Sequence, residues 1–423
     1  MNSRVRRLRL FVAGSIASAV TWFAASASAE PACSAVITRA DVPRCAAAAS
    51  LDVRVEEREA AVREGRRRAA SSLLRTNPTL ALSAAKRDSD VAKATNWSAT
   101  LSQELEIAGQ RGARLRAAEH EVEAQAFRIE SARRDAVAAA WIAYFDVLAR
   151  GEEQRLMTRL STNAAQIATV AKGMADKGVL APIDADVADA SVVAADQARL
   201  EAEAELRRAE LTLASLLGLP EAKASGDLLP LRGVEQVHAG ANGPGTPEVK
   251  AFHAEAKAQE STASAYSRAR IPSPTLSLFV QNDGFDERVL GAGLSFPIPL
   301  PHPVGRFYEG EISEARAAAE RATTESERAR RRADLALESA LTSYESAKSK
   351  RDLYTEERVT RAERDIEALA KELQAGRVAV RDALLTQQAL VTLLRAGVEA
   401  RHALCTASVE LARAANVLDR GVR

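Results

Sequence analysis

The sequence has few of the residues that build disulfide-linked or aromatic-rich domains. It contains 3 cysteines, and aromatic residues make up 4% of its 423 residues. Three cysteines are too few to hold a domain together by disulfides alone. Beyond residue 29, no stretch reaches the roughly 18 uninterrupted apolar residues that a transmembrane helix needs. If this part of the chain crosses a membrane, we therefore expect it to cross as strands.

Residues 1–29 have the pattern of a secretory signal peptide. Four arginines precede a mainly apolar run, and the run ends in Ala27-Ser28-Ala29, a small-x-small cleavage site. We expect the mature chain to begin at Glu30 and to carry no lipid anchor, because no lipobox precedes Cys33. Removing the four arginines leaves 54 of the 58 basic residues against 57 acidic ones, which changes the formal charge from +1 to −3. This balance does not indicate a nucleic-acid binder, and a soluble periplasmic protein is the simple alternative to a membrane protein.

Export would place the cysteines in an oxidising compartment. A disulfide between Cys33 and Cys45 is one possibility, and two free thiols are the other. Cys405 lies among Leu404, Val409 and Leu411 in a helical pattern, which predicts a small buried side chain.

The mature chain repeats one order of motifs twice. Pro78-Thr79-Leu80-Ala81-Leu82 recurs as Pro274-Thr275-Leu276-Ser277-Leu278, and the segment from Gly178 to Ala185 recurs from Gly376 to Ala383. Such self-similarity indicates two copies of one structural unit. We predict a first repeat over residues 30–220, a linker or small equatorial segment over 221–246, and a second repeat over 247–423.

Each repeat opens with an alanine-rich helix, at about 46–74 and 248–269, and continues with a hairpin, at about 78–108 and 274–300. Residues 97–107 and 290–298 alternate apolar with small or polar side chains, which is typical of barrel strands with lipid on one side and water on the other. A two-sided hairpin on a soluble domain would show the same pattern. The prolines at 297, 299, 301 and 303 share one parity and predict the end of the last strand.

The longest predicted element is helical. Residues 311–375 contain neither glycine nor proline, which predicts a helix on the order of 100 Å long. Its counterpart at about 113–177 is interrupted only by Gly151 and Gly173. Each long helix reverses at its glycine turn and returns, over about 184–217 and 382–419. The spacing of Ile366, Leu369 and Leu373 fits a coiled-coil seam, as does that of the set Leu337, Leu341 and Tyr344.

In this order, and twice over, these motifs resemble the TolC-like outer-membrane efflux factors. The resemblance rests on the two glycine turns (178–184 and 376–382), the Leu216-Leu217-Gly218-Leu219-Pro220 segment and the strand exit at residues 103–114. The strand exit is most similar to the CzcC-like branch of that family, which exports heavy metals. The resemblance implies a mainly α-helical chain with a transmembrane β part. Three copies would form a 12-stranded outer-membrane barrel continued by a helical periplasmic tunnel.

The family resemblance also implies partners and site residues. Substrate would arrive from an inner-membrane pump, of the RND type in the metal-exporting branch, through a periplasmic adaptor that meets the turns. By position, Asp382 matches the first carboxylate of the family's acidic gate, whereas Leu385 stands in the place of the second. In the other turn Asp184 and Asp186 match the side that contacts the adaptor, and Gly178 and Gly376 form the two bends. The alternative for each aspartate is a helix N-cap.

Two other kinds of function stay open. A drug-efflux or type I secretion duct would have the same fold, and a periplasmic coiled-coil scaffold without a pore would have the same helices. An enzyme is not expected, because no nucleophile elbow or phosphate loop occurs and residues 240–245 lack the lysine of a phosphate cradle. We predict no catalytic residue, no cofactor and no metal site, since the five histidines show no metal-ligand spacing. These histidines are His120, His238, His253, His302 and His402.

Overall fold

The computed structural model describes residues 33–88, 93–238, 245–282, 287–301 and 303–418. The predicted signal peptide, His302 and residues 239–244 of the glycine-rich segment lie outside the described residues. Residues from Ser34 onward form one unit, and the arrangement below concerns that unit. It is mainly helical with a four-stranded antiparallel sheet.

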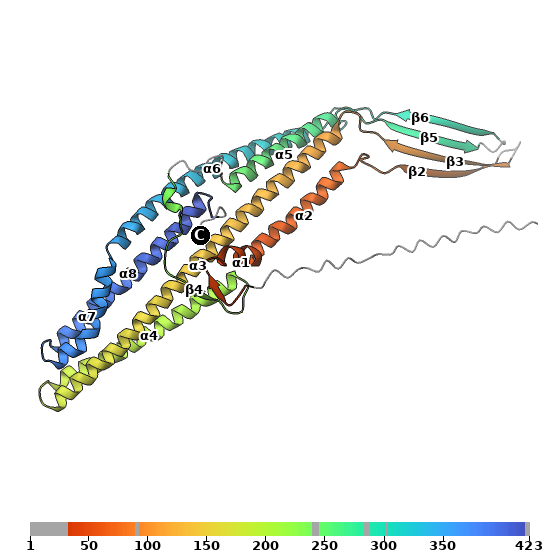
Figure 1. Ribbon diagram of the computed structural model, residues 1–423. Helices are drawn as coiled ribbons and strands as arrows, with labels where there is room; N and C mark the ends of the chain where they lie inside the picture. The colour runs from red at the N-terminus through yellow and green to blue at the C-terminus, as the bar shows by residue number, and fades with distance from the viewer. Residues whose placement is uncertain (1–32, 89–92, 239–244, 283–286, 302, 419–423) are drawn as a thin grey trace, which may run out of the picture. The chain divides into compact units, whose positions relative to one another are not determined.

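The same order of elements occurs in both halves, as predicted from the repeated motifs. Two hairpins are each preceded by one or two helices and followed by helices that run to a turn and back (Figure 1). The first half contains α1 (Val42–Ala49), α2 (Leu51–Ser71), β2 (Thr79–Asp88), β3 (Lys93–Glu104), α3 (Gln110–Asp176) and α4 (Pro182–Leu216). The second half contains α5 (Pro247–Ala269), β5 (Thr275–Asn282), β6 (Arg288–Ser295), α6 (Glu309–Asp352), α7 (Glu356–Gln374) and α8 (Val380–Ala414).

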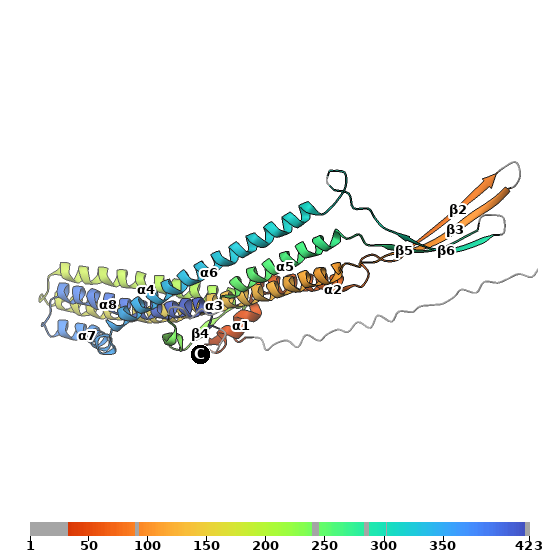
Figure 2. The ribbon, with the colours of Figure 1, turned by 90° about the horizontal axis from the view of Figure 1, so that it is seen from above.

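The two hairpins join into one sheet with strand order β2-β3-β5-β6. Strands β3 and β5 pair across the two halves, with Leu101 opposite Leu278. In both ribbon views the sheet lies at one end of the helices, and the α3–α4 and α7–α8 turns lie at the other (Figures 1 and 2). Among the described residues, none of the helices is both long and apolar enough to cross a membrane.

Helix α3 is the spine of this unit. It has 67 residues, about 100 Å at a rise of about 1.5 Å per residue, and it packs against α2, α4, α5, α7 and α8. Helix α4 buries an alanine at every seventh position, because small side chains on one seam let two helices approach closely. These alanines are Ala188, Ala195, Ala202 and Ala209.

A three-ring cluster lies at the middle of α3. Trp141 stacks on Phe145 with 5.5 Å between ring centroids and meets Tyr144 edge-on at 5.6 Å. Arg39 places its guanidinium 5.6 Å from the Trp141 ring centroid, within the range of a cation–π contact, and donates to the Leu229 and Pro230 carbonyls. This cluster is the largest aromatic part of the buried core.

The segment between the halves is a small packed element. Strand β1 (Val36–Thr38) pairs in parallel with β4 (Lys223–Ser225), and the 3-10 helix η1 (Val234–Gln236) follows. The Tyr144 hydroxyl donates to the Ser225 carbonyl at 2.9 Å, which holds β4 against α3. The described residues of this segment thus pack against the helices, and its role as a linker or an equatorial element stays a prediction.

The second long helix is not continuous, so the prediction of one helix over 311–375 was wrong. It breaks between Asp352 and Glu356. Tyr354 packs on the backbone of Gly397 in α8, at 3.7 Å from the position of an added Cβ. Thr355 then caps α7 by accepting a hydrogen bond from the Arg358 N–H at 3.4 Å. A side-chain contact and a threonine cap, and not a helix-breaking residue, therefore end α6.

The three cysteines have different environments. Cys33 and Cys45 are each disulfide-bonded, whereas Cys405 is a free and buried thiol. Burial raises the pKa of the Cys405 thiol to about 12, so this side chain stays protonated at neutral pH. The pairing of Cys33 with Cys45 that the sequence suggests remains our proposal for these two residues.

Candidate functional site

The four-stranded sheet has two chemically different faces. The register places Leu80, Leu101 and Leu278 side by side across three strands, and the neighbouring row of Leu82, Ala99, Val280 and Leu290 is also apolar. Large side chains that point to this face are solvent-exposed at Leu80, Leu82, Trp97, Leu101, Leu276, Leu278, Leu290 and Leu294. An exposed apolar surface of this extent marks an interaction site or a membrane surface.

The opposite face is mostly polar. It carries the pair Ser83 and Ser98, whose hydroxyls are 2.8 Å apart, and Ser277, whose hydroxyl donates to the Gly293 carbonyl at 3.2 Å. The remaining positions are mainly threonine, serine, alanine and glycine. Phe279 and Val289 are the large apolar exceptions, and the Phe279 ring covers Gly291 on the neighbouring strand. Alternation of this kind separates an apolar environment from water.

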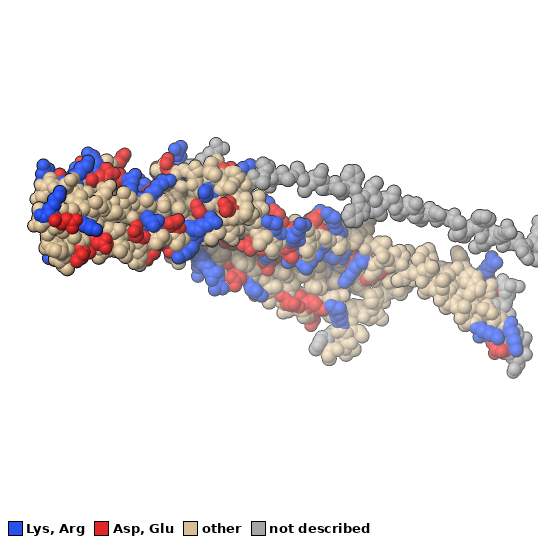
Figure 3. All heavy atoms as spheres, turned by 90° about the horizontal axis from the view of Figure 1, so that it is seen from below, with Lys and Arg blue, Asp and Glu red and all other residues tan. Residues whose placement is uncertain are grey.

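Charged side chains are sparse on the sheet. On the face shown in Figure 3, acidic and basic side chains intermingle over the helices, whereas most of the sheet is free of them. The charged residues of the strands lie mainly at the hairpin ends, where β2 ends and β3 and β6 begin: Lys86, Arg87, Asp88, Lys93 and Arg288. The central part of the sheet is therefore suited to a hydrocarbon layer.

At the far end of the helices the two glycine turns have the same geometry. Gly178 and Gly376 have φ of +70° and +69°, which L-residues with side chains rarely adopt. The Gly178 N–H donates to the Ala175 carbonyl, and the next N–H donates five residues back, to Met174. Gly376 and Arg377 make the equivalent pair of hydrogen bonds. Both turns are thus Schellman motifs, which end a helix at a glycine.

A shared apolar cluster holds the two turns together. Ile167 of α3, Ala188 of α4, Leu373 of α7 and Val380 of α8 are buried in one core. Leu180, two residues after the first glycine, and Val378, two residues after the second, pack against it. The two turns therefore form one four-helix end.

The outer surfaces of the turns differ. Val179 and Ile183 are 68% and 65% exposed in the first turn. The equivalent positions in the second turn are Arg377 and Arg381, both exposed. Arg377 pairs with Glu372 at 3.2 Å. The exposed residues next to the two bends are therefore apolar in the first turn and basic in the second.

The aspartates of the turns do not cap their helices, so the N-cap interpretation was wrong. The N-cap positions are Ala181 and Ala379, and neither has a side-chain cap. Asp184 and Asp382 each lie three residues further on, in the first turn of α4 and α8. A carboxylate there still interacts favourably with the helix dipole. Asp382 and Asp186 are exposed, and Asp184 is half-buried.

The strand exit at residues 103–114 forms the joint between sheet and helices. Gln110 is buried and accepts a hydrogen bond from the Ala108 N–H at 2.9 Å, while its amide donates to the Arg268 and Ile271 carbonyls at the end of α5. Arg114 pairs with Glu106 at 2.6 Å, and the Glu106 side chain is only 5% exposed. The residues that carry the resemblance to the metal-exporting branch thus fix the direction of α3 relative to β3.

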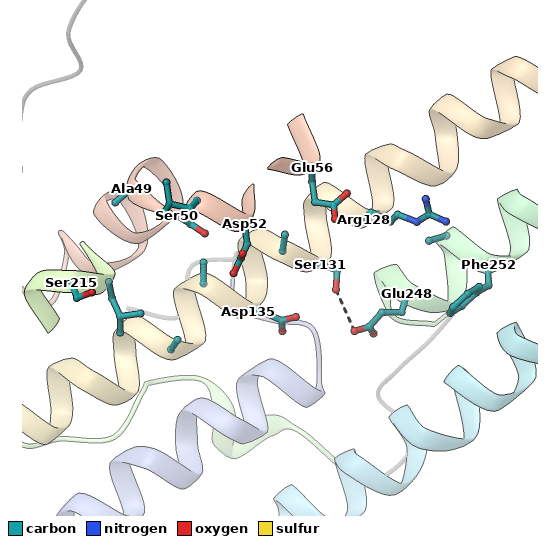
Figure 4. Close-up of a pocket in the computed structure, with 16 residues that line it drawn as sticks. Ala49, Ser50, Asp52, Glu56, Arg128, Ser131, Asp135, Ser215, Glu248 and Phe252 are labelled. Carbon is teal, nitrogen blue, oxygen red and sulfur yellow. Dashed lines mark hydrogen bonds between the residues drawn. The ribbon is translucent and has the colours of Figure 1, made fainter. Parts of the chain in front are cut away.

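A cavity of about 700 Å³ lies between α2, α3 and α5. Four carboxylates line it, and Glu248 points toward Ser131, which donates to it at 3.2 Å (Figure 4). Arg134, with a side chain 6% exposed, pairs with Glu248 at 2.9 Å. Burial alone would raise the pKa of Glu248, but Arg134 and the hydrogen bonds lower it overall. The other three carboxylates are Asp52, Glu56 and Asp135.

The pair of Arg134 with Glu248 joins α3 to α5 at this cavity. In the part of the chain that the structure describes, no group of three or more His, Cys, Asp or Glu side chains could hold a metal ion. His402 lies near Asp146 at 3.9 Å, and burial lowers its pKa. Sequence reasoning missed Arg134 and Glu248, because their pairing depends on the packing of α3 on α5.

Comparison with known proteins points to one family. Residues 44–219 match the sequence model of a family described as "Outer membrane efflux protein". The cobalt-zinc-cadmium resistance protein CzcC of Cupriavidus metallidurans is 28% identical over 218 residues, which cover 50% of this chain and 52% of CzcC. The chain therefore matches about half the length of this curated relative.

The fold matches solved structures over most of the chain. CusC, whose structures were described in connection with transmembrane channel formation, superposes with a TM-score of 0.71 at 14% identity and covers 89% of this chain and 91% of its own. The outer membrane protein VceC of Vibrio cholerae gives a TM-score of 0.71 at 18% identity, over 89% and 95%. A membrane protein from Pseudomonas aeruginosa gives 0.74 at 15%, over 89% and 93%. At these identities the likeness concerns the fold.

The family match also bears on location and class. Its description confirms the predicted location in the outer membrane and agrees with the prediction that the chain is not an enzyme. The family model over residues 44–219 and the shared fold over 89% of the chain together confirm the resemblance to the TolC-like outer-membrane efflux proteins, which are passive channels.

Proposed function

We propose that this chain is the outer-membrane channel of a tripartite efflux system and passively conducts substrate out of the cell. The observation that carries the proposal is the two-faced sheet with open edges at β2 and β6. Open edges have to be paired or covered, and a ring of identical copies pairs each β6 with the next β2. Three copies of four strands form a 12-stranded barrel with the apolar face toward lipid.

The helices continue the path on the periplasmic side. Their four-helix end meets a periplasmic adaptor, which connects the channel to an inner-membrane pump of the RND type. We assign the contact to the turns around Gly178 and Gly376, with Asp184 and Asp186 in the first of them. The exposed Val179 and Ile183 support this assignment, because exposed apolar side chains at a helix end favour association.

Asp382 is the candidate gate residue. In a homotrimer, symmetry would place three Asp382 carboxylates around one axis, and a ring of carboxylates favours cations. Position 385 carries an exposed leucine, so one carboxylate per copy would act at this level.

We infer heavy-metal cations as the substrate. The name of the relative CzcC and the joint at residues 103–114 support this inference. A drug-efflux or type I secretion duct is the alternative within the same fold. A pore-free periplasmic scaffold is the alternative of another class.

Two neighbouring residues test the channel directly. Leu278→Arg places a charge in the centre of the apolar face, at a cost of about 2–4 kcal/mol in the bilayer, and we expect it to abolish membrane insertion and current in planar bilayers. The matched control Ser277→Arg changes the next residue, on the polar face, and should still insert and conduct. Equal tolerance of both variants would contradict the lipid-facing assignment. If the purified wild-type protein were soluble without detergent, monomeric by mass and unable to carry current, the scaffold would be favoured instead.

The substrate needs a separate test. A strain that lacks the gene should lose tolerance to cobalt, zinc or cadmium salts, and the wild-type gene should restore it. Retained metal tolerance together with new sensitivity to organic drugs would overturn the metal assignment and leave the channel intact.

A further inference from the structure

We propose that the segment that follows β6, residues 296–301, is a docking arm that packs on Leu73 and Leu74 of a second copy of this chain. The inference rests on the proposed ring of copies and names the contact that closes it below the barrel. The proposed contact is made by side chains and lies outside the hydrogen-bonded strands.

Strand direction places the two segments together. The four strands are antiparallel throughout, so β6 runs toward the helices and β2 runs away from them. When β6 of one copy pairs with β2 of the next in the same antiparallel manner, Ser295 at the end of β6 lies at the same level as Thr79 at the start of the next β2. The residues after Ser295 therefore meet the residues before Thr79 of the neighbour.

The arm presents apolar side chains that the rest of its own chain leaves uncovered. Phe296, Ile298 and Leu300 are 55%, 81% and 46% exposed, and prolines 297, 299 and 301 alternate with them. Proline has no N–H for a strand ladder, so this segment cannot simply extend β6. Alternating prolines also stiffen it, which lowers the entropy lost on docking.

The receiving segment is exposed and held in place. Leu73 and Leu74 are 80% and 41% exposed. On one side, the Arg111 guanidinium donates to the Ser71 carbonyl at 2.7 Å. On the other, the Gln103 amide donates to the Thr76 carbonyl at 3.0 Å. The two leucines thus project from a short segment that is tied to its own copy at both ends.

The connections of the inner strands differ from these two. The Leu105 N–H donates to the Pro274 carbonyl at 2.8 Å, which joins the exit of β3 to the entry of β5. This backbone hydrogen bond continues the inner pairing below the sheet. At the edges, the corresponding pairing can be completed only by a second copy, and the apolar side chains there supply its contact.

Cysteine cross-linking in the outer membrane tests the arm. Ile298→Cys and Leu73→Cys are placed in one chain, and intact membranes are treated with a short bismaleimide. We expect most of the protein to run as covalent dimers and trimers. The natural cysteines should not interfere, because Cys33 and Cys45 are disulfide-bonded and Cys405 is buried. Co-expression of the two single variants should give covalent dimers, which proves a link between copies.

The control uses the same cysteine cross-linking but places one cysteine at a different height along the sheet. Leu290→Cys with Leu73→Cys uses an equally exposed apolar side chain of β6, further up the sheet, and should give at least tenfold less cross-linked product. Equal amounts of covalent dimer and trimer from both cysteine pairs would indicate non-specific contact and would overturn the proposal. A trimer by native mass spectrometry without a link between the Ile298→Cys and Leu73→Cys positions would overturn the arm and leave the channel standing. A monomer would overturn both.

Lipid is the other possible cover for the arm. A fluorophore attached to the thiol of the Ile298→Cys variant distinguishes the two. If brominated phospholipid quenched this fluorophore, and the Ile298→Cys and Leu73→Cys pair formed no link, the arm would face the membrane and the proposal would fail. Protection of the fluorophore from brominated lipid, together with the link, is the expected result.

Discussion

The two halves of the chain follow one plan but build their long helices differently. Helix α3 continues for 67 residues through Gly151 and Gly173, the two residues that composition marks as weak points. The second half has no such residue between 311 and 375, yet its helix breaks before Glu356. Local propensity is thus a weaker determinant here than side-chain packing, as expected for helices stabilised mainly by tertiary contacts.

The reason for this difference lies in what each helix packs against. Helix α3 has neighbours along its whole length and carries the three-ring cluster at its middle. In the second half, α6 packs against α5 and α7 packs against α8. Tyr354 lies between α6 and α7, where the chain changes direction, and packs over Gly397. The first half therefore supplies the continuous central helix, and the second half packs along it with a helix that is broken into two parts.

The largest expected effect is loss of the three-ring cluster. Trp141→Ala removes a fully buried ring that stacks on Phe145 and contacts Arg39, and should cost about 3–5 kcal/mol of folding stability. Tyr344→Ala, the largest buried side chain of α6, is the matched variant in the second half and should cost less. Thermal unfolding followed by helical circular dichroism compares them. Equal losses would contradict the spine role of the first half.

The next prediction concerns the break between α6 and α7. It compares a glycine that a neighbouring side chain covers with a glycine that has open space around it. Gly397→Leu inserts a side chain where Tyr354 packs and should cost about 1–3 kcal/mol by overpacking. Gly151→Ala has open space around its Cβ position in the middle of α3, and should gain about 0.5–1 kcal/mol. Unfolding midpoints of the two variants should therefore shift in opposite directions. A shift of both in the same direction would show that packing over Gly397 does not set the bend.

The sequence predicted the plan of the fold better than its joints. The repeated turns, the hairpins and the seam at Ile366, Leu369 and Leu373 follow from short patterns within one element, and the structure places them as predicted. The break at Tyr354 depends on a glycine that lies some forty residues further along the chain, so no local pattern marks it. Contacts between distant segments have no signature in periodicity.

The candidate site shows the same division. The two-faced sheet was predicted from alternation along single strands, and the registers agree with it. The N-cap interpretation of the aspartates failed, because the glycine motif sets the helix start and leaves an alanine at the N-cap position. The pairing of Arg134 with Glu248 joins α3 to α5, and neither residue stands out within its own helix.

Variants of the two turn aspartates distinguish an interaction with the helix dipole from a role in gating. Asp184→Asn and Asp382→Asn each remove a carboxylate from the first turn of a helix, and both should cost about 0.3–1 kcal/mol of stability. Only Asp382→Asn should change the conductance or cation preference of the trimer in planar bilayers, because the gate is assigned to the second turn. A change of current in Asp184→Asn of the same size would remove the distinction between the turns.

The smallest expected effect is the pH dependence of the contact between the two halves. Glu248 of α5 has a lowered pKa when paired with Arg134 of α3, so the folded chain binds this proton more weakly than the unfolded chain does. The pair therefore contributes its stability above the ordinary pKa of a glutamate, and the contribution is lost as pH falls below about 4 through the folded value. Glu248→Gln should flatten the fall of the unfolding midpoint between about pH 5 and pH 3. The matched control, Glu255→Gln on the same helix, removes the pair with Arg128 of α3, whose side chain is 37% exposed against 6% for Arg134. It should leave that fall closer to the wild type, because a pair with an exposed partner is screened by solvent. Equal flattening in both variants would show that the burial of Arg134 does not set the effect.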